Sequence, residues 1–147
     1  MKILIDTSIL VALKGVDTAR LSESQRVLQV LDVQEYSLCV CAQVIMEYWA
    51  VATRPITARG GLGLTVSDAD ADIQAFLRQF DLLPDTETLL QVWHDIVRNY
   101  SVSGRQVWDA RIAALMQIHS VTTLLTYNPL DFQRYDFITA LSPSEAY

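Results

Sequence analysis

Short apolar runs alternate with longer segments of helical periodicity along most of the chain. The short runs are rich in Ile, Leu and Val and do not alternate between polar and apolar positions. Such runs are typical of strands that are buried on both faces of a parallel sheet. The pattern predicts strands at residues 3–5, 36–40, 82–83, 121–126 and 138–141.

The segments between these runs place apolar residues three and four positions apart, as amphipathic helices do. Helices are predicted at residues 8–14, from 22 onward, and at 43–53, 67–79, 86–100 and 103–119. Ser22 and Ser67 are predicted N-caps, and Ser103 with Gln106 resembles a capping box.

Buried strands that alternate with helices predict an α/β fold with a central parallel sheet. Residues 1–147 contain no repeat and no linker, so we expect a single domain. The glycine-rich stretch at residues 59–63 lacks the lysine and hydroxyl pattern of a phosphate-binding loop, and we expect a flexible connection there.

Four acidic residues interrupt the apolar pattern. Asp6 directly follows the first predicted strand, and Asp131 lies in a block that follows a later one. Glu47 and Asp109 lie in predicted helices with mostly apolar neighbours. Ligands of parallel α/β sheets bind beyond the carboxyl ends of the strands, near the point where the strand order reverses. The four acids can therefore converge on one site.

Each acid also has an ordinary structural explanation. Asp6 could cap the helix that follows it, Asp131 could cap a short turn, and Asp109 could favour a helix N-terminus through the macrodipole. Glu47 could reach solvent from a narrow polar strip that it shares with Gln43. A divalent cation site explains all four acids together, because Mg²⁺ and Mn²⁺ take carboxylate and water oxygens as ligands.

Composition and charge narrow the possible partners. The net charge of −6 and the pI of about 4.7 argue against a broad basic face for nucleic acid, but not against nucleic acid held through bound cations. No apolar run approaches the roughly 20 residues of a membrane span, and the N-terminus does not resemble a signal peptide. We therefore expect a cytoplasmic protein without membrane contact. Cys39 and Cys41 are expected to be buried thiols, and two histidines leave too few ligands for a zinc site.

The segments ILIDTSIL, CAQVIMEYWAVATRP and VSGRQVWDARIAALMQIHSVTTLLTYNPLDF contain the four acids. These acids are 41, 62 and 22 residues apart, counted from 6 to 47, 47 to 109 and 109 to 131. In this order the segments resemble PIN-domain ribonucleases, specifically the VapC-type toxins of bacterial toxin–antitoxin pairs. The resemblance covers essentially the full length. It implies a three-layer α/β/α fold and an endoribonuclease that depends on Mg²⁺ or Mn²⁺.

By matching position, the resemblance implies that Asp6, Glu47 and Asp109 form the catalytic acidic core. Asp6 and Asp109 would be direct metal ligands, while Glu47 would bind a second ion or orient the attacking water. Many relatives carry the fourth acid at the position of Asn128, and others rely on the aspartate before the phenylalanine. We place Asp131 in this fourth metal-binding position.

Four neighbouring residues have open roles. Thr126 and Asn128 are candidates for supporting the metal ligands, and Asn128 also stays an alternative for the fourth position. Ser8 is a candidate for a hydrogen bond to a metal ligand or to metal-bound water. Trp108 stands where relatives often have a small polar residue or histidine. It could pack in the core or offer an aromatic surface to a base, and core packing is favoured.

The resemblance implies three partners: an RNA substrate, a cognate antitoxin that occludes the site, and a second copy of the chain in a homodimer. The alternative function is a non-catalytic PIN-fold module for binding or scaffolding. The acids retained at positions 6, 47 and 109 argue against it. An aspartyl phosphotransferase based on Asp6 would typically carry a second acid at position 8, where the chain has Ser8.

Overall fold

The computed structural model describes residues 1–146, which form a five-stranded parallel sheet surrounded by helices. The strands are β1 (Lys2–Ile5), β2 (Ser37–Cys41), β3 (Asp81–Leu83), β4 (Thr123–Leu125) and β5 (Thr139–Leu141). Their order is β3-β2-β1-β4-β5, and each neighbouring pair is parallel. All five predicted strands are present, and the predicted parallel α/β class is confirmed.

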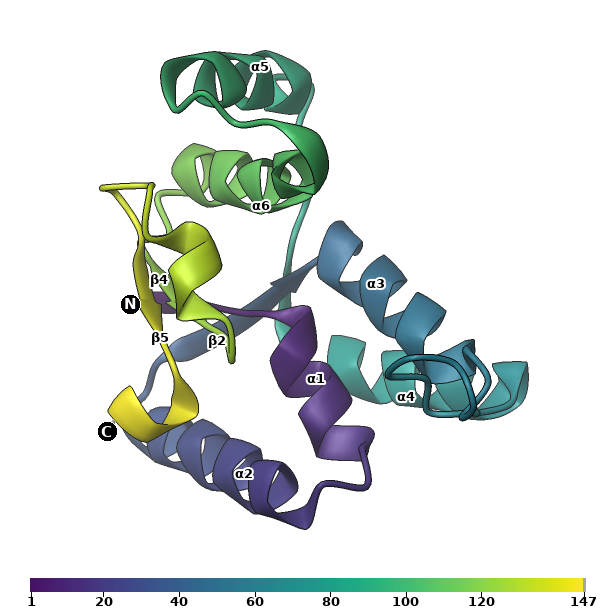
Figure 1. Ribbon diagram of the computed structural model, residues 1–147. Helices are drawn as coiled ribbons and strands as arrows, with labels where there is room; N and C mark the ends of the chain where they lie inside the picture. Colours follow the sequence, from purple (N-terminus) through teal and green to yellow (C-terminus); the bar gives the residue numbers. More distant parts are fainter. Residues whose placement is uncertain (147) are drawn as a thin grey trace.

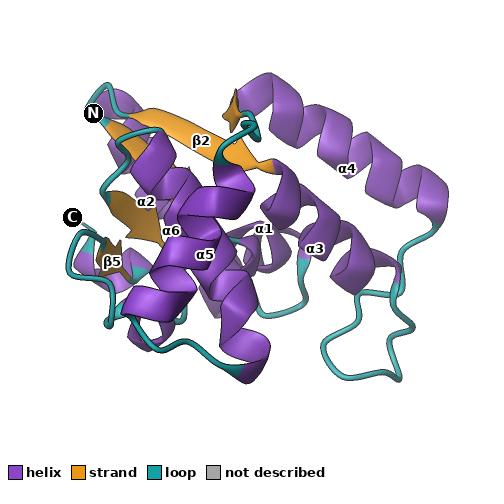
Figure 2. Cartoon of the chain, turned by 90° about the horizontal axis from the view of Figure 1, so that it is seen from above, coloured by secondary structure: helices purple, strands orange, loops and turns teal. Residues whose placement is uncertain are grey.

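Six α-helices connect and cover these strands. They are α1 (Thr7–Lys14), α2 (Thr18–Val33), α3 (Ala42–Thr53), α4 (Val66–Gln79), α5 (Leu89–Asn99) and α6 (Val107–Ile118). Figure 1 shows α5 and α6 on one side of the sheet and α1 and α2 on the other, with α3 and α4 beside α1. In the view from above, α5 and α6 lie side by side (Figure 2). The predicted three-layer α/β/α arrangement is confirmed.

The sheet explains where ligands of this fold would meet the chain. From β1 the chain builds β2 and β3 toward one edge, and it later adds β4 and β5 on the other side of β1. The strand order therefore reverses between β1 and β4, and the carboxyl ends of these two strands lie where parallel α/β sheets generally form a ligand-binding crevice. Asp6 and Thr126 directly follow these ends.

Two helices begin earlier than predicted because a capping residue upstream takes the N-cap position. Asp17 caps α2, and its side chain accepts hydrogen bonds from the backbone of Ala19 and Arg20, so Ser22 lies inside the helix. Thr65 caps α4 in the same way, so Ser67 is also helical.

The predicted helices at 86–100 and 103–119 both begin later than expected. The first begins at Leu89, three residues after the predicted start. The predicted capping box of Ser103 and Gln106 does not form, because Ser103 makes no side-chain capping bond and Gln106 accepts a hydrogen bond from Arg134 instead. A short 3₁₀ turn, η1 (Gly104–Gln106), precedes α6.

The glycine-rich stretch, predicted to be a flexible connection, is hydrogen-bonded to the end of α3. The backbone N–H groups of Leu62, Gly63 and Leu64 donate to carbonyl groups at the end of that helix. These bonds satisfy carbonyl groups that a helix C-terminus leaves without partners. An added Cβ on Gly61 would lie 2.2 Å from the carbonyl oxygen of Pro55.

Two further expectations concern the core and membranes. Cys39 and Cys41 are fully buried free thiols, as predicted, and burial raises their pKa values to about 12 and about 11. Within residues 1–146, no helix combines the length and the apolar character that a membrane span requires.

Replacing Gly61 by Ala should destabilise the protein by about 2 kcal/mol or more, because the new Cβ would overlap backbone atoms that cannot move independently. Urea unfolding measures this loss. Gly60→Ala is the comparison: its Cβ meets open space, so it should cost only the left-handed backbone strain of about 1 kcal/mol. Equal losses for the two variants would contradict the packing of this loop.

Candidate active site

Asp6 lies at the end of β1, and its carboxylate does not cap the helix that follows. It occupies the N-cap position of α1 but makes no side-chain capping bond. Its Oδ2 instead accepts hydrogen bonds from Ser8 Oγ at 2.7 Å and from Thr126 Oγ1 at 2.6 Å. Both donors bind the same oxygen. The other oxygen, Oδ1, has no hydrogen bond within residues 1–146. The capping explanation for this carboxylate is therefore wrong.

The two hydroxyl groups each also accept a backbone hydrogen bond. Tyr127 N donates to Ser8 Oγ at 3.0 Å, and Asn128 N donates to Thr126 Oγ1 at 3.0 Å. The hydroxyl oxygens lie 3.3 Å from each other, and each hydroxyl donates its hydrogen to Asp6, because an ionised carboxylate only accepts. The loop after β4 is thus tied to the carboxylate that follows β1.

Glu47 reaches the same region from the middle of α3. Its Oε2 accepts from Thr7 Oγ1 at 2.9 Å, and its Oε1 accepts from Gln43 Nε2 at 2.8 Å. Gln43 and Glu47 form the expected polar strip, in which Gln43 is only 7% exposed and Glu47 is half-buried. The contribution of Thr7 was not predicted. The signal for this contact in the sequence was the position of Thr7 directly after Asp6.

Asp109 lies half-buried in the first turn of α6, close to the other acids. Its pKa is raised from 3.8 to about 6, first by burial and then by the negative charges of Asp131, Asp6 and Glu47. The guanidinium group of Arg134 opposes this rise. The structure therefore brings all four predicted acids into one electrostatic cluster.

The two candidates for the fourth position, Asp131 and Asn128, differ in how they relate to the other acids. Asp131 lies exposed in the 3₁₀ turn η2 (Pro129–Phe132), and its charge raises the pKa of Asp109 more than any other charge does. Asn128 is exposed and precedes this turn without a side-chain capping bond. Only its backbone joins the network, through Thr126.

The donor set suits a hard divalent cation. None of the three ion pairs found within residues 1–146 involves these four acids, so a cation would relieve repulsion that the protein leaves in place. In the same residues, no three acids, histidines or cysteines already form a ready-made metal cage. Mg²⁺ does not need one, because it is commonly held by one or two carboxylates, waters and substrate phosphates.

Trp108, next to Asp109, is not part of the core. Its side chain is 61% exposed, so the predicted core packing is wrong. It lines a mostly apolar hollow of about 640 Å³ together with Leu90 and Trp93. Arg111, at the edge of this hollow, forms an ion pair with Asp85 at 2.6 Å.

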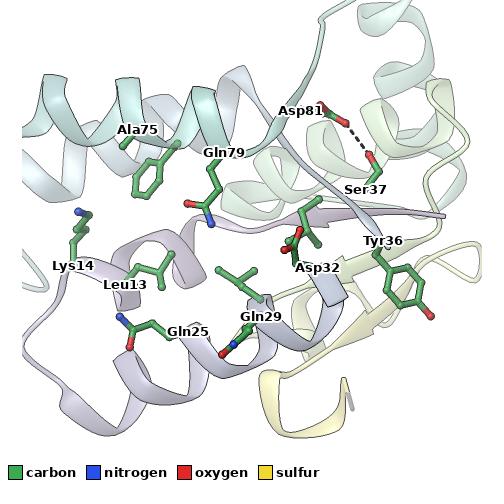
Figure 3. A pocket seen from close by; sticks show the side chains of 13 residues that line it. Leu13, Lys14, Gln25, Gln29, Asp32, Tyr36, Ser37, Ala75, Gln79 and Asp81 are labelled. Atoms are coloured by element: carbon green, nitrogen blue, oxygen red, sulfur yellow. Dashed lines mark hydrogen bonds between the residues drawn. The ribbon is translucent and has the colours of Figure 1, made fainter. Parts of the chain in front are cut away.

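A second cavity, of about 700 Å³, lies apart from the acids (Figure 3). Its lining comes from the end of α1, from α2 and α4, and from the amino ends of β2 and β3. Ser37 donates to Asp81 across one side of it at 2.8 Å. Because the four acids gather at the carboxyl ends of the strands, this cavity contributes nothing to their site.

Comparison with known proteins identifies the fold. The model of the PIN domain matches residues 3–138. The chain belongs to the PIN domain family. The family prediction is therefore confirmed, and the four acids lie in a PIN domain. No sequence among the curated proteins matches the chain.

Several solved structures similar to this PIN domain are described as toxins or toxin–antitoxin complexes. VapBC-1 from nontypeable Haemophilus influenzae is 15% identical, with a TM-score of 0.71 over 98% of this chain and 99% of that one. VapBC2 from Rickettsia felis, bound to a promoter DNA fragment, is 14% identical, with a TM-score of 0.70 over 97% and 98%. VapC20 from Mycobacterium tuberculosis, a sarcin–ricin loop cleaving toxin, is 21% identical, with a TM-score of 0.58 over 92% of both chains. At these identities the likeness shows a shared fold.

The raised pKa of Asp109 makes a prediction about stability. The pKa of Asp109 is higher in the folded chain than in the unfolded chain. The folded protein therefore loses stability as the pH rises from about 4 to about 6, because ionising this carboxyl group costs more free energy in the folded state. Asp109→Asn should therefore stabilise the metal-free protein at pH 7.5 by about 1 kcal/mol, discounted for partial exposure.

Urea unfolding in a chelator at pH 7.5 and at pH 4 measures this difference, which should vanish at the lower pH. Asp95→Asn is the matched control, since Asp95 is exposed on α5. It should leave the stability unchanged at both pH values. An Asp109→Asn variant less stable than wild type at pH 7.5 would contradict the repulsion between the acids.

Proposed function

We propose that this PIN domain is a divalent-metal-dependent endoribonuclease that acts as the toxin of a toxin–antitoxin pair. The proposal is carried by one observation: Asp6, Glu47, Asp109 and Asp131 come from four separate segments and gather at the crevice of a PIN fold. A protein with no use for a cation gains nothing from three carboxylates whose charges raise the pKa of Asp109.

Asp6 and Asp109 are assigned as the direct ligands of Mg²⁺ or Mn²⁺, with Asp131 beside them. The two hydroxyl bonds to Oδ2 hold the Asp6 carboxylate in one orientation and leave Oδ1 for a ligand. A divalent ion held by these residues would lower the pKa of a coordinated water and offset the charge of the scissile phosphate. Glu47 orients the attacking water and accepts its proton.

RNA is the proposed substrate, although the chain carries a net charge of −6. Its phosphates would be repelled by bare acids and attracted once cations are bound, which couples substrate binding to the metal. The fold similarity to VapC20, a sarcin–ricin loop cleaving toxin, supports a ribonuclease over a DNA nuclease. A non-catalytic scaffold remains the alternative, and it predicts no cleavage.

A small antitoxin is the proposed protein partner. Several similar folds are found in such complexes, including VapBC-1 of Haemophilus influenzae and a toxin–antitoxin complex from Klebsiella pneumoniae. A basic side chain of the antitoxin would match the unpaired carboxylates of the site, because complementary charges favour association.

A homodimer is also proposed, on the basis of exposed apolar side chains near the site. Met46 of α3, Leu90 of α5 and Trp108 of α6 are 65%, 74% and 61% exposed. Large exposed apolar side chains on neighbouring elements are typical of interfaces between subunits.

Substituting the acids should abolish cleavage without unfolding the protein. Asp6→Asn and Glu47→Gln are each expected to lower the rate of RNA cleavage with Mg²⁺ or Mn²⁺ by about 100-fold or more. Asp131→Asn should reduce the rate more than Asn128→Ala if Asp131 holds the fourth position.

Purified wild type, variants and a chelator-treated sample are compared on the same RNA by gel electrophoresis, with circular dichroism as the folding control. Full activity in the chelator, or in Asp6→Asn, would disprove the metal mechanism. A folded wild type that cleaves no RNA with either metal would favour the scaffold alternative.

A charge placed in the apolar surface should weaken the homodimer. Leu90→Lys is expected to shift the protein from dimer to monomer, because a buried lysine in the interface would lose its hydration. Light scattering after size-exclusion chromatography measures the mass. Val16→Lys is the control, since Val16 is 90% exposed at a different place in the fold. A monomeric wild type would disprove the dimer.

A further inference from the structure

Gln43 has a buried side-chain amide, and both its nitrogen and its oxygen make hydrogen bonds. Its Nε2 donates to Glu47 Oε1 at 2.8 Å and to the backbone oxygen of Trp108 at 3.0 Å. Its Oε1 accepts from Arg111 Nη1 at 3.3 Å. The carboxylate and the carbonyl only accept, and the guanidinium only donates, so the partners permit one orientation of the amide.

The guanidinium of Arg111 is held in place by a second contact. Its Nη2 lies 2.6 Å from Asp85 Oδ2, at the start of the loop after β3. Asp85 therefore neutralises the charge of Arg111 through Nη2, while Nη1 donates to the side-chain oxygen of Gln43. The amide of Gln43 stands between this cation and the carboxylate of Glu47.

Within residues 1–146, Glu47 therefore receives hydrogen bonds from neutral donors only. Gln43 binds one of its oxygens and Thr7 binds the other, at 2.8 and 2.9 Å. One bond per oxygen fixes a long, flexible side chain without adding positive charge. A direct bond from Arg111 would occupy the carboxylate and offset the charge that it needs to accept a proton.

We propose that Gln43 is the positioning residue of Glu47: it fixes the carboxylate in the crevice and separates it from Arg111. This inference rests on the proposed ribonuclease function, in which Glu47 aligns the attacking water. Gln43 touches neither substrate nor metal in this role. Its effect on the reaction passes through Glu47.

Gln43→Met tests the role, because methionine has nearly the same length and volume but neither donates nor accepts strongly. Loss of a supporting hydrogen bond of this kind is expected to lower kcat for RNA cleavage by roughly 10- to 100-fold. KM should change by less than about twofold, since RNA binding does not use Gln43. Gln91→Met is the matched control: Gln91 bonds Asp95 four residues on, but on the exposed face of α5, and its loss should leave kcat unchanged.

A double-mutant cycle separates positioning from a general structural effect. On a Glu47→Ala background, which retains only residual cleavage, Gln43→Met should cause no further loss. A loss of the same factor on both backgrounds would overturn the proposal, because Gln43 would then act independently of Glu47. A wild-type kcat in Gln43→Met would overturn it as well, while leaving the ribonuclease function intact.

The hydrogen bonds themselves are tested without any activity. In the NMR spectrum of the full chain, the side-chain amide hydrogens of Gln43 should exchange with solvent at least 10-fold more slowly than those of Gln91, and Glu47→Ala should shift one of them. Exchange as fast as that of Gln91 would overturn the geometry, even if Gln43→Met does not fold. A wild type that cleaves no RNA with Mg²⁺ or Mn²⁺ would overturn the proposed function, and the positioning role with it.

Discussion

The parallel pairing of β1 with β4 is the contact on which the site depends. The N–H of Asp6 donates to the carbonyl of Leu125 at 3.0 Å, so the ladder between the strands continues to the residue that begins the site. Immediately beyond it, Ser8 and Thr126 bind the Asp6 carboxylate from the two chain segments. Fixing these two strand ends fixes the crevice, and the helices then bring Glu47 and Asp109 to it.

The site holds carboxyl groups close together at a cost to stability. Neutral donors bind one oxygen of Asp6 and both oxygens of Glu47, and none of the ion pairs within residues 1–146 includes the four acids. Hydroxyl and amide donors orient a carboxylate without cancelling its charge. The raised pKa of Asp109 is the visible consequence. In the proposed function a cation would offset this repulsion, and it would attract the phosphates of a substrate that the net charge of the chain would otherwise repel.

The acids are surrounded by polar groups on one side and by exposed apolar side chains on another. Toward the crevice, polar groups hold the carboxylates in one arrangement. Around the start of α6, Trp108 and Leu90 present apolar area to the outside. Gln43 lies between these regions, joined to Glu47 on one side and to the Trp108 carbonyl and Arg111 on the other. A partner seated on the apolar surface would therefore lie close to the groups that orient the site.

The sequence by itself determined the fold class, the five strands and the four acids, because the spacing of apolar residues records burial along the local chain. Local patterns were less decisive at helix ends, where Asp17 and Thr65 compete with Ser22 and Ser67 for the same capping role. Only the tertiary structure decided that Asp6 binds hydroxyl groups rather than its own helix, that Thr7 and Gln43 hold Glu47, and that Trp108 faces outward. The partners in these contacts lie as far as 120 residues apart. Their meeting depends on the order of strands in the sheet, which hydrophobic periodicity does not encode.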